Sequence, residues 1–185
     1  MSDLSFRAVY DAHVGYVGRL LLRFGVPHKD LEDLIQEVFV VVHRRAADFD
    51  PTRPLKPWLM GIAFRVASDW RRRAFQREDA TDTLDFSTDP HSPTSGAALE
   101  ARTHAHALVL RALRTLPFQQ RGALVLCDLE GESPKDVAAL FDVAVGTIYA
   151  RLHDARIAFK AAVQTIERGS GHASKTPAAE HPHGV

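Results

Sequence analysis

The 185-residue chain contains a single cysteine, Cys127, and no apolar run long enough to cross a membrane. One cysteine can form neither an internal disulfide nor a two-cysteine metal site, and we expect Cys127 to be a small core residue of a helix. Uncharged apolar stretches such as residues 58–64 are far shorter than the roughly 20 residues that span a bilayer. The first residues carry Asp3, Arg7 and Asp11, so they lack the apolar core of a secretory signal.

The chain also lacks net charge, because 23 Lys and Arg residues balance 23 Asp and Glu residues. The charges are nevertheless segregated along the sequence. Residues 51–77 hold seven bases and one acid, whereas residues 78–110 hold six acids and one base. A basic block of this density favours a phosphate-binding surface, with a solvated helix end as the alternative.

Apolar residues recur at the 3–4 spacing of amphipathic helices, and strand patterns are missing from the sequence. This periodicity predicts helices over 4–25, over 30–46 and from 57 to about 74. Hydrophobic residues make up 45% and charged residues 25% of the chain, the balance of an ordinary soluble globular protein. The predicted fold class is therefore all-α.

Residues 78–98 are acidic and rich in Ser, Thr, Asp and Pro, which is typical of a flexible linker. A relaxed coil of the 26 residues 78–103 spans only about 28 Å, so we expect the segments on either side to sit close together in the free protein. The predicted organisation is a helical domain at 1–77, a flexible acidic linker at 78–103, a second helical domain at 104–167 and a disordered tail at 168–185.

The second domain has the pattern of a helix-turn-helix. Ser133 is placed as a helix cap, since Pro134 follows it and Asp136 stands three residues on. Residues 142–146 turn the chain, and Asp142 tolerates the left-handed conformation that such a turn needs. Thr147 is expected to cap the next helix.

The helix that begins at Thr147 is expected to enter the major groove of DNA. Arginine side chains suit phosphates or guanine edges, histidine can donate or accept, and a carboxylate can accept from cytosine. A helical hairpin that binds protein is the alternative. The outward positions are Tyr149, Ala150, His153 and Asp154, flanked by Arg151 and Arg156.

Both halves of the chain resemble the extracytoplasmic-function (ECF) sigma factors, the small two-domain sigma subunits of bacterial RNA polymerase. Their region 2 is similar to DLEDLIQEVFVVVHRRAADFDPTRPLKPWLMGIAFRVASDWRRR. Their region 4 is similar to LRTLPFQQRGALVLCDLEGESPKDVAALFDVAVGTIYARLHDAR. Two motif sets in the right order, separated by a linker, are more specific than either alone. The resemblance implies a region 2 helical bundle joined by the linker to a region 4 helix-turn-helix.

The resemblance also implies a function. Such a protein binds core polymerase, recognises the −35 and −10 promoter elements and promotes DNA melting for transcription initiation. Asp33, Gln36 and Glu37 would dock on the clamp helices of the polymerase's largest subunit. These side chains lie opposite the apolar face of their helix, so we expect them to point outward; a carboxylate metal site is disfavoured because no histidine shares that face.

The loop at 47–54 and the helix at 57–73 would open the −10 element and capture an unstacked base of the non-template strand. Trp58 and Trp70 share the apolar face and are expected to belong to the core. Region 4 would bind the −35 element through the helix beginning at Thr147 and dock on the flap of the second-largest subunit. The phosphate contacts at the −10 element would come from Arg53, Lys56, Arg65, Arg71 and Arg72.

An anti-sigma factor is the further partner that the resemblance implies, and the cytoplasm is the implied location, without membrane insertion of the chain itself. We expect no cofactor, no metal and no catalytic residue, since the sequence has no glycine-rich phosphate loop and no nucleophile–base arrangement. A stand-alone helix-turn-helix regulator is the alternative function. It explains residues 117–160 but leaves the acidic helix face and the Trp- and Arg-containing helix without a role.

Overall fold

A computed structural model describes residues 3–78 and 97–172 of the chain, and these residues form helices and the turns between them. Strands are absent from both described ranges, and the all-α prediction is confirmed. The N-terminal domain contains α1 (Asp3–Phe24), α2 (His28–Arg44), the short 3-10 helix η1 (Ala46–Asp48) and α3 (Leu55–Glu78). The C-terminal domain contains α4 (Ala97–Arg114), α5 (Phe118–Leu124), the π-helical turn η2 (Val125–Leu129), α6 (Pro134–Phe141) and α7 (Val145–His172).

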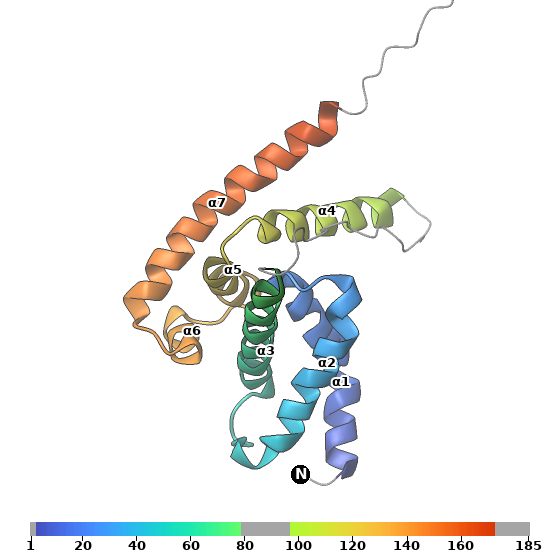
Figure 1. The fold of residues 1–185 in the computed structure, drawn as a ribbon, viewed down its shortest axis with the longest axis vertical. Helices are drawn as coiled ribbons and strands as arrows, with labels where there is room; N and C mark the ends of the chain where they lie inside the picture. The colour runs from blue at the N-terminus through green and yellow to red at the C-terminus, as the bar shows by residue number, and fades with distance from the viewer. Residues whose placement is uncertain (1–2, 79–96, 173–185) are drawn as a thin grey trace, which may run out of the picture.

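In the N-terminal domain, α1, α2 and α3 pack against one another as a three-helix bundle (Figure 1). The helices form where the apolar periodicity predicts them, because their apolar faces bury one another. Gly25 adopts a left-handed φ of 95° and ends α1, and the backbone N–H of Val26 then donates to the carbonyl of Leu21 at 3.0 Å. The side chains buried in this core include Val17, Leu20, Leu21, Leu34, Val38, Val42, Leu59 and Ala63.

In the C-terminal domain, α6 and α7 form the helix-turn-helix, with α4 and α5 packed along α7. The predicted cap at Ser133 is confirmed: its hydroxyl accepts from the backbone N–H of Asp136 at 3.2 Å and lies 2.6 Å from the Asp136 carboxylate. Asp142 adopts the expected left-handed conformation, with φ 54° and ψ 51°. The predicted cap at Thr147 is wrong, because α7 begins two residues earlier and the Thr147 N–H donates to the carbonyl of Ala144.

Two predicted boundaries also need correction. Helix α4 begins at Ala97, inside the predicted linker, since residues 97–101 are all strong helix formers. Helix α7 continues to His172, beyond the predicted start of the tail at residue 168. The remainder of the predicted linker, residues 79–96, and the remainder of the predicted tail, residues 173–185, lie outside the described residues.

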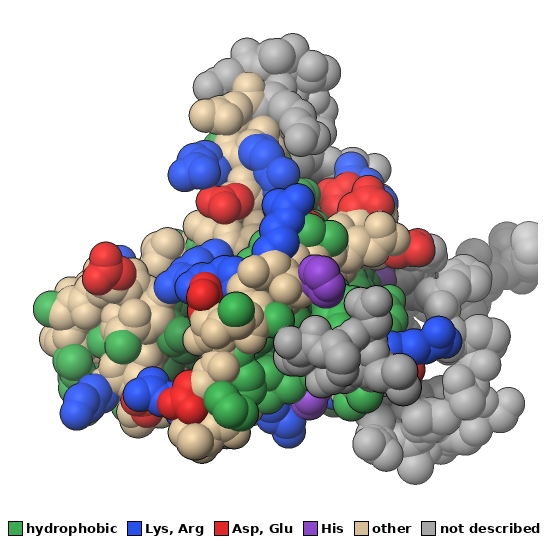
Figure 2. Space-filling view, turned by 90° about the horizontal axis from the view of Figure 1, so that it is seen from below, with side chains coloured by type: hydrophobic (Ala, Val, Ile, Leu, Met, Phe, Trp, Pro, Cys, Tyr) green, Lys and Arg blue, Asp and Glu red, His purple; other side chains and the backbone are tan. Residues whose placement is uncertain are grey.

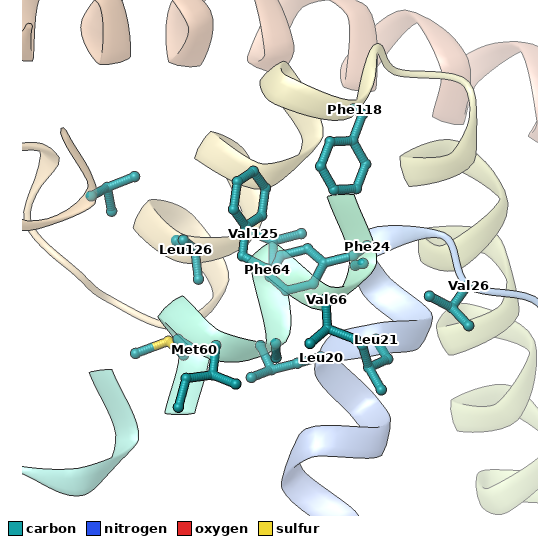
Figure 3. Close-up of a cluster of buried hydrophobic side chains, with 14 of the residues drawn as sticks. Leu20, Leu21, Phe24, Val26, Met60, Phe64, Val66, Phe118, Val125 and Leu126 are labelled. Carbon is teal, nitrogen blue, oxygen red and sulfur yellow. The ribbon is translucent and has the colours of Figure 1, made fainter. Parts of the chain in front are cut away.

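The two domains pack on each other through aromatic rings from both (Figure 3). Phe64 of α3 stacks on Phe118 and on Phe141, with ring centroids 5.0 and 4.0 Å apart and interplanar angles of 20° and 12°. The Phe24 ring packs edge-on against the Phe64 ring, with the ring centroids 5.4 Å apart. Gly122 makes room for this stack, because a β-carbon there would lie 2.4 Å from the Phe64 ring.

A buried arginine, Arg121 of α5, ties the two domains together. It is 4% exposed, and its guanidinium donates to the carbonyl of Phe24 at 2.7 Å, at the C-terminal end of α1. It also donates to the carbonyls of Arg114 and Leu116 at 2.8 and 2.9 Å, at the C-terminal end of α4. Burial, and secondarily the positive charges of Arg71 and Arg114, lower the pKa of Arg121 to about 10, so it stays charged at neutral pH.

We expect Arg121→Met to lower the free energy of unfolding by about 3 kcal/mol or more, because three carbonyls at two helix ends, two of them in buried hydrogen bonds, lose their donor. Urea denaturation followed by circular dichroism measures this change. Arg111→Met makes the same substitution at an exposed site of α4 and should change the free energy of unfolding by less than about 0.5 kcal/mol. Equal effects of the two substitutions would contradict the role given to Arg121.

Candidate nucleic-acid interface

The first turns of α7 present a polar face to solvent. Tyr149 is 60% exposed, and Ala150, His153 and Asp154 are also exposed. Ile148, Leu152 and Ala155 on the other side of the helix are buried against α5 and α6. Helix periodicity thus separates an exposed face, the one expected to read DNA and called the recognition face below, from a packing face. Thr147 is half-buried at the start of this helix.

Both arginines that flank the recognition face are held by the preceding helices. Arg156 donates to both carboxylate oxygens of Asp128, at 2.8 and 2.7 Å, and this pairing raises the pKa of Arg156 above its usual value. Arg151 donates to the side-chain oxygen of Gln119 at 3.2 Å. The two guanidinium groups are therefore oriented before any ligand arrives, although Asp128 offsets the charge of Arg156.

The basic residues predicted for the −10 element lie on different sides of α3. Arg65 and Arg72 are seven residues, about two turns, apart and share an exposed face. Arg72 pairs with Asp69 at 3.1 Å. The Lys56 ammonium lies 5.6 Å from the centre of the Tyr16 ring, toward α1.

The predicted basic residues also line two different cavities. Arg53 and Arg65 line one cavity of about 510 Å³, together with the aromatic pair Phe49 and Trp58. Arg71 lines a separate cavity of about 470 Å³, where its guanidinium lies 5.7 Å from the centre of the Phe118 ring. The structure therefore brings Arg53 and Arg65 together and separates Arg71 from them. Figure 2 shows basic side chains in a broken band across one face of the molecule, with acidic side chains beside them.

The loop before α3 is shaped by hydrogen bonds around Asp50. Its carboxylate accepts from the hydroxyl and the backbone N–H of Thr52, at 2.7 and 3.0 Å, and lies 3.6 Å from Arg53. These hydrogen bonds, the hydroxyl first, lower the pKa of Asp50, and the charge of Arg53 adds a smaller effect. Trp58 and Trp70 pack against the hydrophobic core, as predicted, but they are only half-buried, and each lines a cavity.

The acidic side chains of α2 point outward, as the sequence predicts. Asp33 and Gln36 are exposed, whereas Leu34 on the opposite face is buried. Glu37 is half-buried and accepts from the guanidinium of Arg73 of α3, at 2.9 and 3.2 Å. Of the three predicted docking residues, Asp33 and Gln36 are therefore free of α3. Within the described ranges, no group of three or more His, Cys, Asp or Glu side chains is placed to hold a metal ion.

Sequence reasoning missed the polar residues between the domains. Glu130 of the C-terminal domain accepts from the Tyr16 hydroxyl at 2.9 Å and from the Arg23 guanidinium. Burial, and then this hydrogen bond and the charge of Glu130, raise the pKa of Tyr16. The sequence does contain one signal for the burial of Arg121, since it is a lone charge within the apolar segment that follows Pro117. No local pattern marks Glu130, because it lies in a turn among other acids.

Family models match both halves of the chain. Residues 9–76 match Sigma-70 region 2, and residues 106–159 match Sigma-70, region 4. The ECF RNA polymerase sigma factor SigE of Mycolicibacterium smegmatis is 32% identical over 145 residues, which cover 78% of this chain and 56% of that protein. The chain thus spans little more than half of that relative. The ECF RNA polymerase sigma-E factor of Escherichia coli is 29% identical over 161 residues, covering 82% of this chain and 83% of that protein.

Solved structures show the same fold. The sigma factor RpoE from Bartonella quintana, in complex with the anti-sigma factor NepR, superimposes with a TM-score of 0.65 at 23% identity, covering 86% of this chain and 97% of that one. The structure of CnrH, in complex with the cytosolic domain of CnrY, superimposes with a TM-score of 0.59 at 25% identity, covering 89% of this chain and 90% of that one.

The chain is a two-domain, all-helical protein with an exposed polar helix face on one domain and a basic helix on the other, features that are typical of DNA-binding proteins. With region 2 and region 4 both matched in order, the chain belongs to the sigma-70 family and, within it, to the ECF sigma factors. Among the described helices, none is long and apolar enough to cross a membrane.

We expect Thr52→Val to raise the pKa of Asp50 toward its ordinary value, because the strongest hydrogen bond to the carboxylate is lost, whereas Thr52→Ser should keep the pKa low. The folded-state pKa lies below the unfolded one, so this interaction favours the folded loop above about pH 4 and is lost on acidification through the folded pKa. A carboxyl-detected NMR titration measures both variants. Equal pKa values for Asp50 in the two would contradict the assignment.

Proposed function

We propose that this chain is the promoter-specificity subunit of a bacterial RNA polymerase. It binds the core enzyme, recognises the −35 and −10 elements and promotes DNA melting at the start of transcription. The observation that carries the proposal is the ordered pair of region matches within one chain, together with the exposed face of α7. A stand-alone regulator is not favoured, since it would leave the N-terminal domain without a role.

Region 4 contacts the −35 element through α7. Tyr149, Ala150, His153 and Asp154 face the base edges, because they share the exposed side of the first turns. Thr147, Arg151 and Arg156 lie at the border of that face. Both carboxylate oxygens of Asp128 pair with the Arg156 guanidinium, and the negative charge of Asp128 offsets the positive potential that Arg156 presents to DNA. Arg151 is therefore the stronger phosphate donor of the two.

Region 2 acts on the −10 element through the loop at 47–54 and α3. Unstacking a base costs a few kcal/mol, and phosphate contacts and stacking must offset this cost. Arg53 and Arg65 are the primary donors because they share one cavity with Phe49 and Trp58. The remaining predicted donors, Lys56, Arg71 and Arg72, extend the positive potential along the backbone.

Two surfaces of the chain dock on the polymerase. Asp33, Gln36 and Glu37 of α2 contact the clamp helices of the largest polymerase subunit, and region 4 docks on the flap of the second-largest subunit. An anti-sigma factor is a further partner that the family implies. We assign the chain no catalytic reaction of its own and place it in the cytoplasm, where the polymerase works.

Run-off transcription with purified core polymerase and a genomic promoter pool tests the proposal. We expect specific transcripts with the chain and none without it. Asp33→Lys should reduce the transcript at least about tenfold by weakening core binding, while Asp11→Lys, a matched change at an exposed carboxylate of α1, should not. A chain that yields no transcript from any promoter, yet binds duplex DNA tightly alone, is a regulator instead.

Replacing Arg65 and Arg72 together by Gln should slow open-complex formation roughly tenfold or more, because two phosphate contacts are lost. Core binding, followed by co-elution, should not change. Permanganate reactivity of the melted strand measures opening, and Arg19→Gln at an exposed site of α1 is the control. Unchanged opening in the double variant would show that this face of α3 does not touch the strand.

A further inference from the structure

One cavity is lined by three arginines and by none of the acidic residues that the structure describes. Its volume of about 470 Å³ lies within the range of roughly 300–1,000 Å³ that small-molecule sites occupy. The arginines are Arg71 of α3 and, from the other domain, Arg114 and Arg121. The cavity near Arg53 differs, because carboxylates line it as well. An unbalanced positive charge inside a cavity favours an anionic ligand.

Other described side chains do not neutralise these three arginines. Neither Arg71 nor Arg114 makes an ion pair within the described ranges, although both arginines that follow Arg71 in α3 are paired with carboxylates. Burial, and then the positive charges of Arg71 and Arg114, lower the pKa of Arg121, so the three guanidinium groups lie close enough to repel one another. An anion in the cavity would offset this repulsion.

Arg121 also has one hydrogen bond still to donate. Its side chain is 4% exposed, and its two terminal nitrogens donate to three backbone carbonyls. Its Nε is buried as well, and this nitrogen has no acceptor among the described residues. Because buried donors are nearly always paired in folded proteins, the Nε of an arginine that lines the cavity is a second, independent indication of a bound acceptor.

Aromatic rings form another part of the cavity wall. Trp70 and Phe75 of α3 and Phe118 of α5 line it. The Arg71 guanidinium lies 5.0 Å from the centre of the Phe75 ring and 5.7 Å from the centre of the Phe118 ring. Phe75 is 54% exposed and Trp70 is half-buried, so both rings keep accessible surface. Accessible rings beside guanidinium groups are surfaces on which nucleobases stack.

We propose that this cavity binds a nucleotide. The phosphates lie at Arg71 and Arg114, whose side chains are half-buried in the wall, and the base lies against Trp70 and Phe75. A simple anion would leave the rings uncovered, and an uncharged aromatic compound would leave the arginines without a counter-charge. A ligand that carries both groups matches the whole wall. The proposal goes beyond the proposed function and does not depend on it.

Isothermal titration calorimetry of the full chain with three probes tests the site. ADP without magnesium joins a purine to two phosphates, pyrophosphate has the phosphates alone, and adenosine has the base alone. We expect one ADP per chain, bound at least about tenfold more tightly than either of the other probes, because ADP combines ion pairing with stacking. No binding of ADP at millimolar concentration, or equal affinity for ADP and either of the other probes, would overturn the proposal.

A charge variant locates ADP in the cavity. Arg114→Gln removes one positive charge from the wall and should weaken ADP binding at least about fivefold. The backbone carbonyl that accepts from Arg121 remains, and circular dichroism checks that the fold is kept. Arg111→Gln makes the same change one turn earlier in α4, at an exposed site outside the cavity, and should leave ADP binding unchanged. Equal affinities of the two variants for ADP would overturn the proposed site.

A ring variant tests the place of the base. Phe75→Leu keeps an apolar side chain but removes the ring, so it should weaken ADP binding at least about threefold and leave pyrophosphate binding unchanged. Equal losses for ADP and pyrophosphate would overturn the stacking of the base.

A short single-stranded oligonucleotide supplies the same phosphate and base chemistry from DNA. We expect it to displace ADP only at concentrations above those of ADP itself. Displacement at lower concentrations would overturn the assignment of the cavity to a free nucleotide. The sigma function is scored separately by run-off transcription, so either proposal can fail while the other stands.

Discussion

The ring of Phe64 is the contact on which the arrangement of the two domains depends. It stacks on both Phe118 and Phe141, so a single residue of α3 contacts two segments of the C-terminal domain. Stacked aromatic pairs are worth about 0.5–1.5 kcal/mol beyond the apolar area that they bury. Gly122 permits this approach because any side chain there would occupy the space of the ring.

Beside this apolar stack lies the guanidinium of Arg121, which has no carboxylate partner within residues 3–78 and 97–172. Arg121 is held by three carbonyls at two helix ends, where unpaired oxygens carry partial negative charge. A planar guanidinium can donate in several directions at once, which a lysine ammonium on a flexible stem does less well. The helix end of α1 is therefore completed by the C-terminal domain, and the chain reversal at Gly25 is stabilised from outside its own bundle.

The Phe64 stack and the hydrogen bonds of Arg121 determine which surfaces of the chain are exposed. The α2 face around Asp33 and the α7 face around Tyr149 are open, so surfaces proposed for polymerase and for the −35 duplex are accessible together. The surface around Arg53 and Arg65 instead faces Glu132 and Asp136 across a cavity.

Local rules in the sequence determined the helices, the cap at Ser133, the left-handed turn at Asp142 and the outward face of α2, since each depends on residues within a few positions of one another. The positions of Arg121 and Glu130 could not be predicted in this way. Arg121 meets Phe24 across 97 residues, and Glu130 meets Tyr16 across 114. Only tertiary packing decided those contacts, and with them which side of α3 is covered, because helix periodicity places a side chain on a face but does not name the helix that packs against it.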